Sequence, residues 1–294
     1  MQAHSDVAEA LDRLRELGSV RRPDDRVLGD FLSLYYFELP EEDVDDRKID
    51  DIYAVGVAHL DLGRVRAVGA PVVRVVSPER ERDGWQSAHS VVLMVTDDMP
   101  FLVDSMRMVL ERHDLDIHLL VHPMLTVERD RGGEMQRVAS FTARGSLADS
   151  VVEAWTQIEI DRVDDATAAI LEAELLAAIS DVRGVVVDFM AMRDRLLSLV
   201  HVHPAMHWMA NGQFVFLGAI DVDCDVRGAA TPRLATGLGQ LRDPDAVGAV
   251  AFPTSSDRED RPAVMTRADT ISTVFRPQRL TVLIVSDPDE PGVQ

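Results

Sequence analysis

Three histidines, His201, His203 and His207, lie close enough in the sequence to suggest a metal-binding cluster. Because His203 and His207 are four residues apart, a helix that includes both would place their imidazoles on one face. The sequence offers no obvious cysteine or carboxylate partner at a ligand spacing, and Trp208 follows directly. We therefore interpret the group as a packing patch between domains and expect no metal site.

A nucleotide site would need a glycine-rich turn, and the nearest match is Gly237-Leu238-Gly239. This segment lacks the third glycine of the Gly-x-Gly-x-x-Gly fingerprint and follows a loop instead of a strand. A phosphate-binding loop of the Walker type is also missing from the sequence. We expect this chain to bind no nucleotide cofactor.

Lysine chemistry is limited to one residue, because Lys48 is the only lysine in the sequence. A Schiff base, a proton-shuttling amine or a carboxylate anchor would have to use it. Lys48 lies in the charged run of residues 41–51, which is typical of a solvated helix face. We expect no catalytic residue in this chain.

The turn that follows a predicted strand at residues 89–96 is the best candidate for a ligand site. A helix is expected to begin there, so the amides of residues 101–103 can bind an α-carboxylate, while Asp98 can hold an α-ammonium group. In the alternative interpretation, Asp98 only caps the helix and Phe101 fills the core. The candidate effector-binding residues are Asp98, Met99, Pro100, Phe101, Leu102, Asp104 and Ser105.

Apolar residues at helical spacing predict three helices in residues 1–66. The first helix is expected to end at Gly18, the second to begin after Pro23, and the third to follow Pro40 with an acidic first turn. We interpret residues 1–66 as a helical segment that docks onto another surface.

From about residue 70 the apolar period changes from 3.6 to 2, which indicates a new domain. Residues 67–200 are predicted to form a β-α-β-β-β-α module with a trailing linker helix. We expect a long strand at 117–127, a helix from Asp164 and a second helical stretch after Gly184. This order favours an α+β fold in which both helices cover one face of an antiparallel sheet.

Residues 201–294 repeat the alternation less clearly and are predicted to form a second module of the same class, whose completeness the pattern leaves open. A short helix at 204–211 and a strand at 213–220 are expected, followed by strands near 264–266 and 279–285. The stretch at 227–261 is rich in glycine, proline and aspartate, so a loop is expected there.

Composition limits the partners and the location of the chain. A net charge of −21 would repel a nucleic acid backbone. The single cysteine, Cys224, cannot form an internal disulfide, and the start carries no basic-then-apolar signal segment, so we expect a cytoplasmic location. No apolar run reaches the length of a membrane span. A chain of 294 residues is long enough for two or three domains.

Six short motifs give the chain a resemblance to the large bacterial NAD-specific glutamate dehydrogenases, in which they follow the same order. The first two motifs are specific enough to identify the family, and the resemblance extends over nearly the whole chain. The motifs are Asp98-Met99-Pro100-Phe101-Leu102-Val103-Asp104-Ser105, Ile117-His118-Leu119-Leu120-Val121-His122-Pro123, Ala191-Met192-Arg193-Asp194-Arg195, Phe214-Val215-Phe216-Leu217-Gly218, Gly237-Leu238-Gly239-Gln240-Leu241-Arg242 and Ser272-Thr273-Val274-Phe275-Arg276-Pro277.

The resemblance implies a helical amino-terminal segment followed by successive ACT-type modules, a fold class associated with amino-acid sensing. It also implies that the chain precedes a catalytic portion of the same polypeptide, which converts L-glutamate to 2-oxoglutarate with NAD. Catalysis in that family would require an anchoring lysine, a general acid–base lysine and aspartate, and a Rossmann domain, a set that this chain does not contain.

Three hypotheses about function follow. In the leading one, the chain is a regulatory and assembly region of a homo-oligomer, and an amino acid at the Asp98 turn shifts the distant catalytic portion between states. In the second, it is a structural scaffold that uses the outward surface of the helical segment and binds no small ligand. The third, a free-standing enzyme, is the least favoured.

Overall fold

The computed structural model describes residues 3–37, 39, 47–143, 147, 149–224, 230–248 and 263–286. The chain divides into two compact units. The first contains residues 1–98 and 109–176, and the second contains residues 99–108 and 177–294. Each unit has a hydrophobic core of its own.

The first unit begins with the helices α1 (Ala3–Arg21), α2 (Leu28–Tyr35) and α4 (Ile49–Gly63), so the three predicted helices are present. The predicted end of the first helix at Gly18 is wrong, because α1 continues through this glycine to Arg21. Asp25 accepts hydrogen bonds from the amides of Val27 and Leu28 at 3.2 and 3.3 Å and thereby satisfies free donors at the start of α2. Asp50 and Asp51 occupy the first turn of α4, where negative charge suits the helix dipole. The predicted start after Pro40 lies outside the described residues.

A six-stranded sheet forms the centre of the first unit, and all its neighbouring strands are antiparallel. Its strand order is β1-β2-β6-β4-β5, and β3 also pairs with β6. β6 is therefore the central strand, with β2 on one side and both β3 and β4 on the other. The strands are β1 (Val72–Val76), β2 (Ser90–Asp97), β3 (Ile117–Val121), β4 (Met124–Arg129), β5 (Met135–Ser140) and β6 (Ser150–Ile160).

The single long strand expected at 117–127 is instead two strands, β3 and β4, separated by His122 and Pro123. Proline has no amide hydrogen and cannot donate to a strand ladder, which explains a break at this point. The carbonyl oxygen of Pro123 still accepts a hydrogen bond from the amide of Trp155 at 3.0 Å, so the break stays attached to β6.

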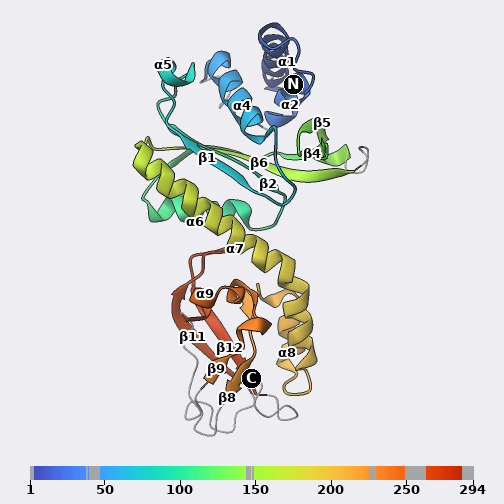
Figure 1. Ribbon diagram of the computed structural model, residues 1–294, viewed down its shortest axis with the longest axis vertical. Coiled ribbons are helices and arrows are strands. Elements are labelled where there is room, and N and C mark those ends of the chain that lie inside the picture. Colours follow the sequence, from blue (N-terminus) through green and yellow to red (C-terminus); the bar gives the residue numbers. More distant parts are fainter. Residues whose placement is uncertain are drawn as a thin grey trace. The chain divides into compact units, whose positions relative to one another are not determined.

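Helices cover both faces of this sheet (Figure 1). On one face lie α1, α2 and α4. On the other lie the end of α6 (Leu102–Arg112) and the beginning of α7 (Asp165–Ser198), joined by a salt bridge of 3.1 Å between Arg112 and Glu174. The α+β class with an antiparallel sheet is confirmed, but residues 1–66 also share the core of the sheet domain. The helix α5 (Arg80–Asp83) and the 3-10 helix η1 (Phe141–Ala143) complete this unit.

The core between the helical segment and the sheet is built around Trp155, which is fully buried on β6. The ring of Phe31 from α2 packs edge-on against the indole at a centroid distance of 4.8 Å. A Cβ atom on Gly63 would lie only 2.3 Å from the Cη2 atom of Trp155. Helix α4 therefore approaches the sheet more closely at Gly63 than any side chain there would permit.

The helix α7 continues through Gly184 without interruption, so the predicted break at this glycine is wrong. An interior glycine costs a helix only about 1 kcal/mol, which packing can offset. The backbone of Gly239 packs against the helix here, 3.5 Å from the position a Cβ of Gly184 would occupy, which is an ordinary van der Waals distance.

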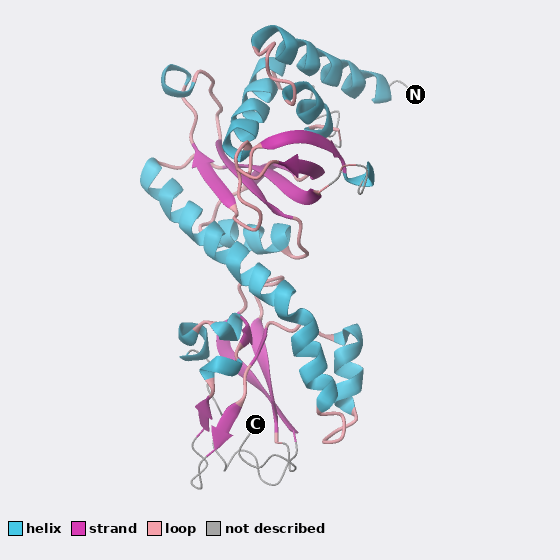
Figure 2. Cartoon of the chain, turned by 45° about the vertical axis from the view of Figure 1, so that its right-hand side comes forward, coloured by secondary structure: helices cyan, strands magenta, loops and turns pink. Residues whose placement is uncertain are grey.

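The described strands of the second unit pair as three two-stranded antiparallel ribbons, visible as magenta arrows in Figure 2. The strands predicted near 264–266 and 279–285 are confirmed within the β11–β12 ribbon. The second ACT-like module stays a prediction. The strands are β7 (Gly218–Ala219), β8 (Val222–Cys224), β9 (Ala230–Pro232), β10 (Leu238–Gly239), β11 (Ala263–Ile271) and β12 (Arg279–Val285).

The remaining elements of the second unit are short helices. The helix expected at 204–211 is present as α8 (Ala205–Trp208) and a π-helical turn η2 (Met209–Gln213), in which Gly212 has a φ of 85°. The strand expected at 213–220 is reduced to the two residues of β7, since η2 occupies its start. The described part of the predicted loop also carries η3 (Leu234–Thr236), η4 (Gln240–Arg242) and α9 (Pro244–Gly248).

A buried carboxylate ties these short elements to α7. Asp188 accepts hydrogen bonds from the amide of Gly239 at 2.8 Å and from the guanidinium of Arg242 at 2.7 Å. The hydrogen bond from Arg242 is the main cause that lowers the pKa of Asp188. The carboxylate is therefore ionised at neutral pH and serves as an anchor for the β10–η4 segment.

Candidate functional site

The turn predicted as a ligand site begins where β2 ends, at Asp97. The amide of Asp98 donates a hydrogen bond to the carbonyl oxygen of Val152 at 3.1 Å, which holds the first residue of the turn against β6. The side chain of Asp98 is exposed. Its negative charge opposes the lowering of the His122 pKa that burial causes, so Asp98 acts on a neighbouring histidine.

A cavity of about 600 Å³ lies beside this turn in the first unit and is lined by Asp97, Asp98 and Asp149. One of the three carboxylates, that of Asp97, is paired with the guanidinium of Arg66 at 2.8 Å. Residues 150–152, at the start of β6, form part of the wall. An excess of negative charge suits a positively charged group such as an ammonium and opposes carboxylates and phosphates.

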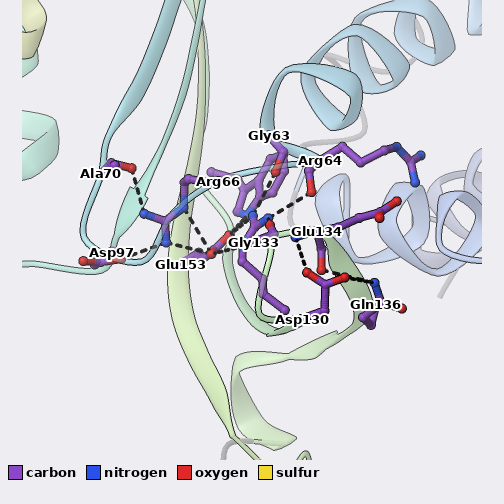
Figure 3. A network of polar contacts seen from close by, with 12 residues as sticks. Gly63, Arg64, Arg66, Ala70, Asp97, Asp130, Gly133, Glu134, Gln136 and Glu153 are labelled. Atoms are coloured by element: carbon purple, nitrogen blue, oxygen red, sulfur yellow. Dashed lines mark hydrogen bonds and ion pairs between the residues drawn. The ribbon is translucent and has the colours of Figure 1, made fainter.

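The wall of this cavity is fixed by a buried network of polar contacts (Figure 3). The side chain of Arg66 is fully buried, and its guanidinium donates to a carboxylate oxygen of Glu153 at 2.7 Å and to the carbonyl oxygen of Ala70 at 2.9 Å. Since the same guanidinium binds Asp97, Arg66 connects the last residue of β2 to the centre of β6.

A second arginine, Arg129 of β4, completes the network. Its guanidinium binds both carboxylate oxygens of Glu153, at 2.7 and 2.9 Å, and donates to the carbonyl oxygens of Gly63 and Gly133 at 2.9 and 2.8 Å. The indole nitrogen of Trp155 also donates to Glu153 at 3.2 Å. One buried carboxylate therefore joins the end of α4, the β4–β5 hairpin and the turn beside the cavity.

The start of α6 contributes to packing in the second unit. Phe101 has a positive φ of 72°, and its ring lies 5.2 Å from the ring of Phe275, which also has a positive φ, of 73°. The hydroxyl of the buried Ser105 accepts a hydrogen bond from the amide of Phe275 at 3.3 Å. This arrangement fits the alternative interpretation, in which Phe101 fills a core.

The seven predicted residues thus differ in environment. Among the described residues, Asp98 is the one of the seven that lines the acidic cavity. Leu102 and Ser105 are buried, Met99 and Phe101 are half-buried, and Pro100 and Asp104 are exposed. The contribution of the amides of residues 101–103 to ligand binding stays a prediction.

The histidine group near residue 200 makes local hydrogen bonds. Ring nitrogens of His201 and His203 lie 2.8 Å from the carbonyl oxygen of Ser198 and 3.1 Å from the amide of Ala205. His207 contacts the side chain of Asn211 at 3.1 Å. Within the described ranges, no set of three histidine, cysteine, aspartate or glutamate side chains is placed to hold a metal ion.

Sequence reasoning missed a row of side chains on β6 that we call the polar stripe, formed by Glu153, Trp155, Gln157 and Glu159. Alternate residues of a strand share one face, and this face lies against α2 and α4. Glu153 binds Arg66 and Arg129, and Glu159 binds Arg47 at 2.6 Å. The signal in the sequence was two carboxylates and an amide at two-residue spacing within an otherwise apolar strand.

Comparison with known proteins agrees with this geometry. Residues 31–175 match the family model described as the ACT1 domain of glutamate dehydrogenase. The NAD-specific glutamate dehydrogenase of Halomonas elongata is 33% identical over 230 residues, which are 71% of this chain and 14% of that protein. The enzyme of the same name from Pseudomonas aeruginosa is 33% identical over 165 residues, 50% of this chain and 10% of that protein.

The chain thus matches about one seventh of the length of these relatives or less. The ACT1 match contains α4, the whole six-stranded sheet and the acidic cavity beside Asp98. In the part of the chain that the structure describes, no helix is long and apolar enough to cross a membrane.

Proposed function

This chain belongs to the NAD-specific glutamate dehydrogenase family, and we propose that it is a non-catalytic regulatory and assembly region of a longer enzyme of that family. The ACT1 match across the sheet carries the proposal. The parent reaction is the oxidative deamination of L-glutamate to 2-oxoglutarate, with NAD bound by the catalytic portion. We place the enzyme in the cytoplasm.

The partners in this proposal are the catalytic portion of the same polypeptide and further copies of the chain in a homo-oligomer. The regulatory ligand is an amino acid whose ammonium group binds the acidic cavity at Asp98. A ligand shifts the balance between two states only when it binds one of them more tightly. The network around Glu153 supports such coupling, because it connects the cavity wall to α4 and to the β4–β5 hairpin.

Replacing Asp98 tests the effector site. We expect Asp98→Asn to weaken the binding of the effector amino acid by about tenfold, or about 1.4 kcal/mol, because it removes one charge that faces the ammonium group. Isothermal titration calorimetry of the 294-residue chain with each standard L-amino acid measures this change.

The matched control is Asp24→Asn, which removes an exposed carboxylate from the loop before α2, away from the cavity. Equal affinity in the Asp98→Asn variant and the parent chain would remove Asp98 from the effector site. If no amino acid gives a heat of binding with the parent chain, the chain has no amino-acid effector, and assembly remains as its role.

The scaffold hypothesis is favoured by exposed apolar side chains on the helical segment. Val20 on α1 and Phe37 after α2 are 72% and 69% exposed, so both side chains are accessible to a partner subunit. Deleting residues 1–66 would expose the core around Trp155, so a point substitution is the sharper experiment.

If this surface joins subunits, Phe37→Ser should shift the chain from oligomer to monomer in sedimentation equilibrium, since large apolar side chains dominate interface energies. The substitution removes an exposed ring, so the unfolding midpoint should stay close to that of the parent chain. An unchanged mass for both Phe37→Ser and Val20→Ser would exclude this surface from assembly.

A further inference from the structure

A second cavity, of about 770 Å³, lies in the first unit, on the face of the sheet that α1, α2 and α4 cover. Its lining comes from the start of α4, from α5 and the loop that follows it, and from the end of β6. The volume falls within the range of about 300–1,000 Å³ that is usual for small-molecule sites. The acidic cavity at Asp98 shares none of its lining residues.

The walls of this cavity are largely apolar. The aromatic side chains of Tyr36 and Trp85 contribute to them, together with Ile52, Val55 and Leu119. Tyr36 is fixed, because its hydroxyl donates a hydrogen bond to the carbonyl oxygen of Ile52 at 2.9 Å. A ligand that fills this space therefore needs an apolar body.

Two charged pairs in the lining are already satisfied. Glu159, the last member of the polar stripe, binds the guanidinium of Arg47 at 2.6 Å, and its side chain is only 4% exposed. Arg162 donates to the carbonyl oxygen of Ser87 at 3.0 Å and lies 3.5 Å from the carboxylate of Glu79. These groups define the shape of the cavity, and they have few free hydrogen-bond donors or acceptors left for a ligand.

Three further charges have no oppositely charged partner among the described residues. They are the ammonium group of Lys48, the guanidinium of Arg80 and the carboxylate of Asp51. Arg80 makes one long contact of 3.4 Å, to the side-chain oxygen of Gln86. Within the described ranges, two cations and one anion that line the cavity thus have no ionic partner, in a chain whose acidic residues outnumber its basic ones by 51 to 30.

This distribution of charge narrows the class of ligand. Since Glu79 and Glu159 are paired with arginines, Asp51 is the carboxylate that opposes a purely anionic ligand such as a phosphate ester or a dicarboxylate, which would leave it without a partner. A simple amine would be repelled by Lys48 and Arg80. A zwitterion with an apolar body satisfies all three free charges and the walls together.

We propose that this cavity is a binding site for an α-amino acid with an apolar side chain, whose carboxylate lies between Lys48 and Arg80 and whose ammonium group faces Asp51. The inference rests on the proposed regulatory function. It places the amino acid on the face of the sheet that α1, α2 and α4 cover, opposite the face covered by the end of α6 and the beginning of α7. The only lysine of the chain then has a specific role, as a carboxylate ligand.

The site is tested by titrating the 294-residue chain with L-leucine and L-phenylalanine in a calorimeter. We expect at least one of them to bind. For phenylalanine, phenethylamine lacks the carboxylate and 3-phenylpropionate lacks the ammonium group, so each should bind at least about tenfold more weakly. Equal binding of either analogue would overturn the zwitterion assignment.

The double variant Lys48→Gln/Arg80→Gln should weaken binding by at least about tenfold, because both carboxylate ligands are lost. Both side chains are exposed, so the fold should persist, and the unfolding midpoint verifies this. The matched control is Arg131→Gln, an exposed arginine in the β4–β5 turn that does not line the cavity.

The Asp98→Asn variant separates this inference from the proposed function. If the apolar amino acid no longer binds to Asp98→Asn but still binds to the double variant, the second site is overturned. Amino-acid regulation would then remain assigned to the Asp98 turn. Binding that is lost in the double variant and kept in Asp98→Asn supports the second site. If a polar amino acid binds at Asp98 but no apolar one binds the chain, the second site is wrong and the proposed regulation stands. If no amino acid binds at all, both the second site and the proposed amino-acid sensing are wrong.

Discussion

The Glu153→Ala variant is expected to lose about 3–5 kcal/mol of its free energy of unfolding, the usual cost of removing one partner of a buried ion pair. The substitution leaves Arg66 and Arg129, whose side chains are 0% and 3% exposed, without the carboxylate that both bind. Asp97 already accepts a hydrogen bond from Nη2 of Arg66, and the carboxylate that both arginines share is that of Glu153, so Asp97 does not replace it.

Urea unfolding followed by tryptophan fluorescence measures this loss, since Trp155 donates a hydrogen bond to Glu153 and is buried beside it. The control variant Glu111→Ala removes an exposed glutamate from α6 and should change stability by less than about 0.5 kcal/mol. A loss below about 1 kcal/mol for Glu153→Ala would mean that the two arginines find other partners or reach water.

Regular periodicity was enough to predict much of the first unit from sequence. The helices α1, α2 and α4 and the strand β2 lie where the apolar pattern predicts them. Gly18 and Gly184 were each predicted to end a helix, and Pro123 was placed inside a single strand; these three predictions were wrong. Pro123 divides a strand without ending its attachment to β6, and both glycines lie inside helices because one interior glycine costs a helix only about 1 kcal/mol.

The polar stripe explains why the position of the helical segment could not be predicted. Alternating glutamate and glutamine residues on β6 indicate a face in contact with water, and a separate helical segment agrees with that interpretation. In the structure, α2 and α4 cover this face. The partners of the stripe, Arg66 and Arg47, stand 87 and 112 residues away along the chain, so no local pattern signals the pairing.

The candidate site was predictable only in its local part. The Asp98 turn follows from a strand end and a helix start, which adjoin in sequence. The acidic cavity beside it also requires Asp149, and the second cavity joins α4 to the end of β6. Contacts over such separations depend on the strand order, which sequence periodicity does not determine.

His59 on α4 is expected to make the stability of the chain depend on pH below neutrality. The imidazole is fully buried between Tyr35, whose hydroxyl lies 2.7 Å from Nδ1, and the carbonyl oxygen of Met94, 3.0 Å from Nε2. Since a carbonyl only accepts, Nε2 carries the proton and Nδ1 accepts from Tyr35. Burial lowers the pKa of His59 to about 3, and the hydrogen bond to Met94 offsets part of that effect.

The direction of this pH dependence follows from how many protons His59 binds in the folded and in the unfolded chain. In the unfolded chain His59 takes up a proton below its ordinary pKa of 6.5, whereas the folded chain resists protonation down to about 3. The contribution of neutral His59 to stability is therefore complete above pH 6.5 and is lost as the pH falls toward 3. Linkage puts the loss at about 2 kcal/mol at about pH 5 and about 4–5 kcal/mol in total.

Unfolding in urea at several pH values between about 5 and 7 isolates this effect, because unperturbed carboxylates titrate below that window. The His59→Gln variant should be less stable at neutral pH, yet its stability should fall less steeply as the medium is acidified. His122→Gln is the matched control: burial lowers the pKa of His122 as well, but that residue is less buried than His59 and should account for a smaller part of the slope.

An unchanged slope in His59→Gln would show that the helical segment separates from the sheet before His59 is protonated. The packing of α4 against β2 would then open locally, and the core around Trp155 would be weaker than its burial implies.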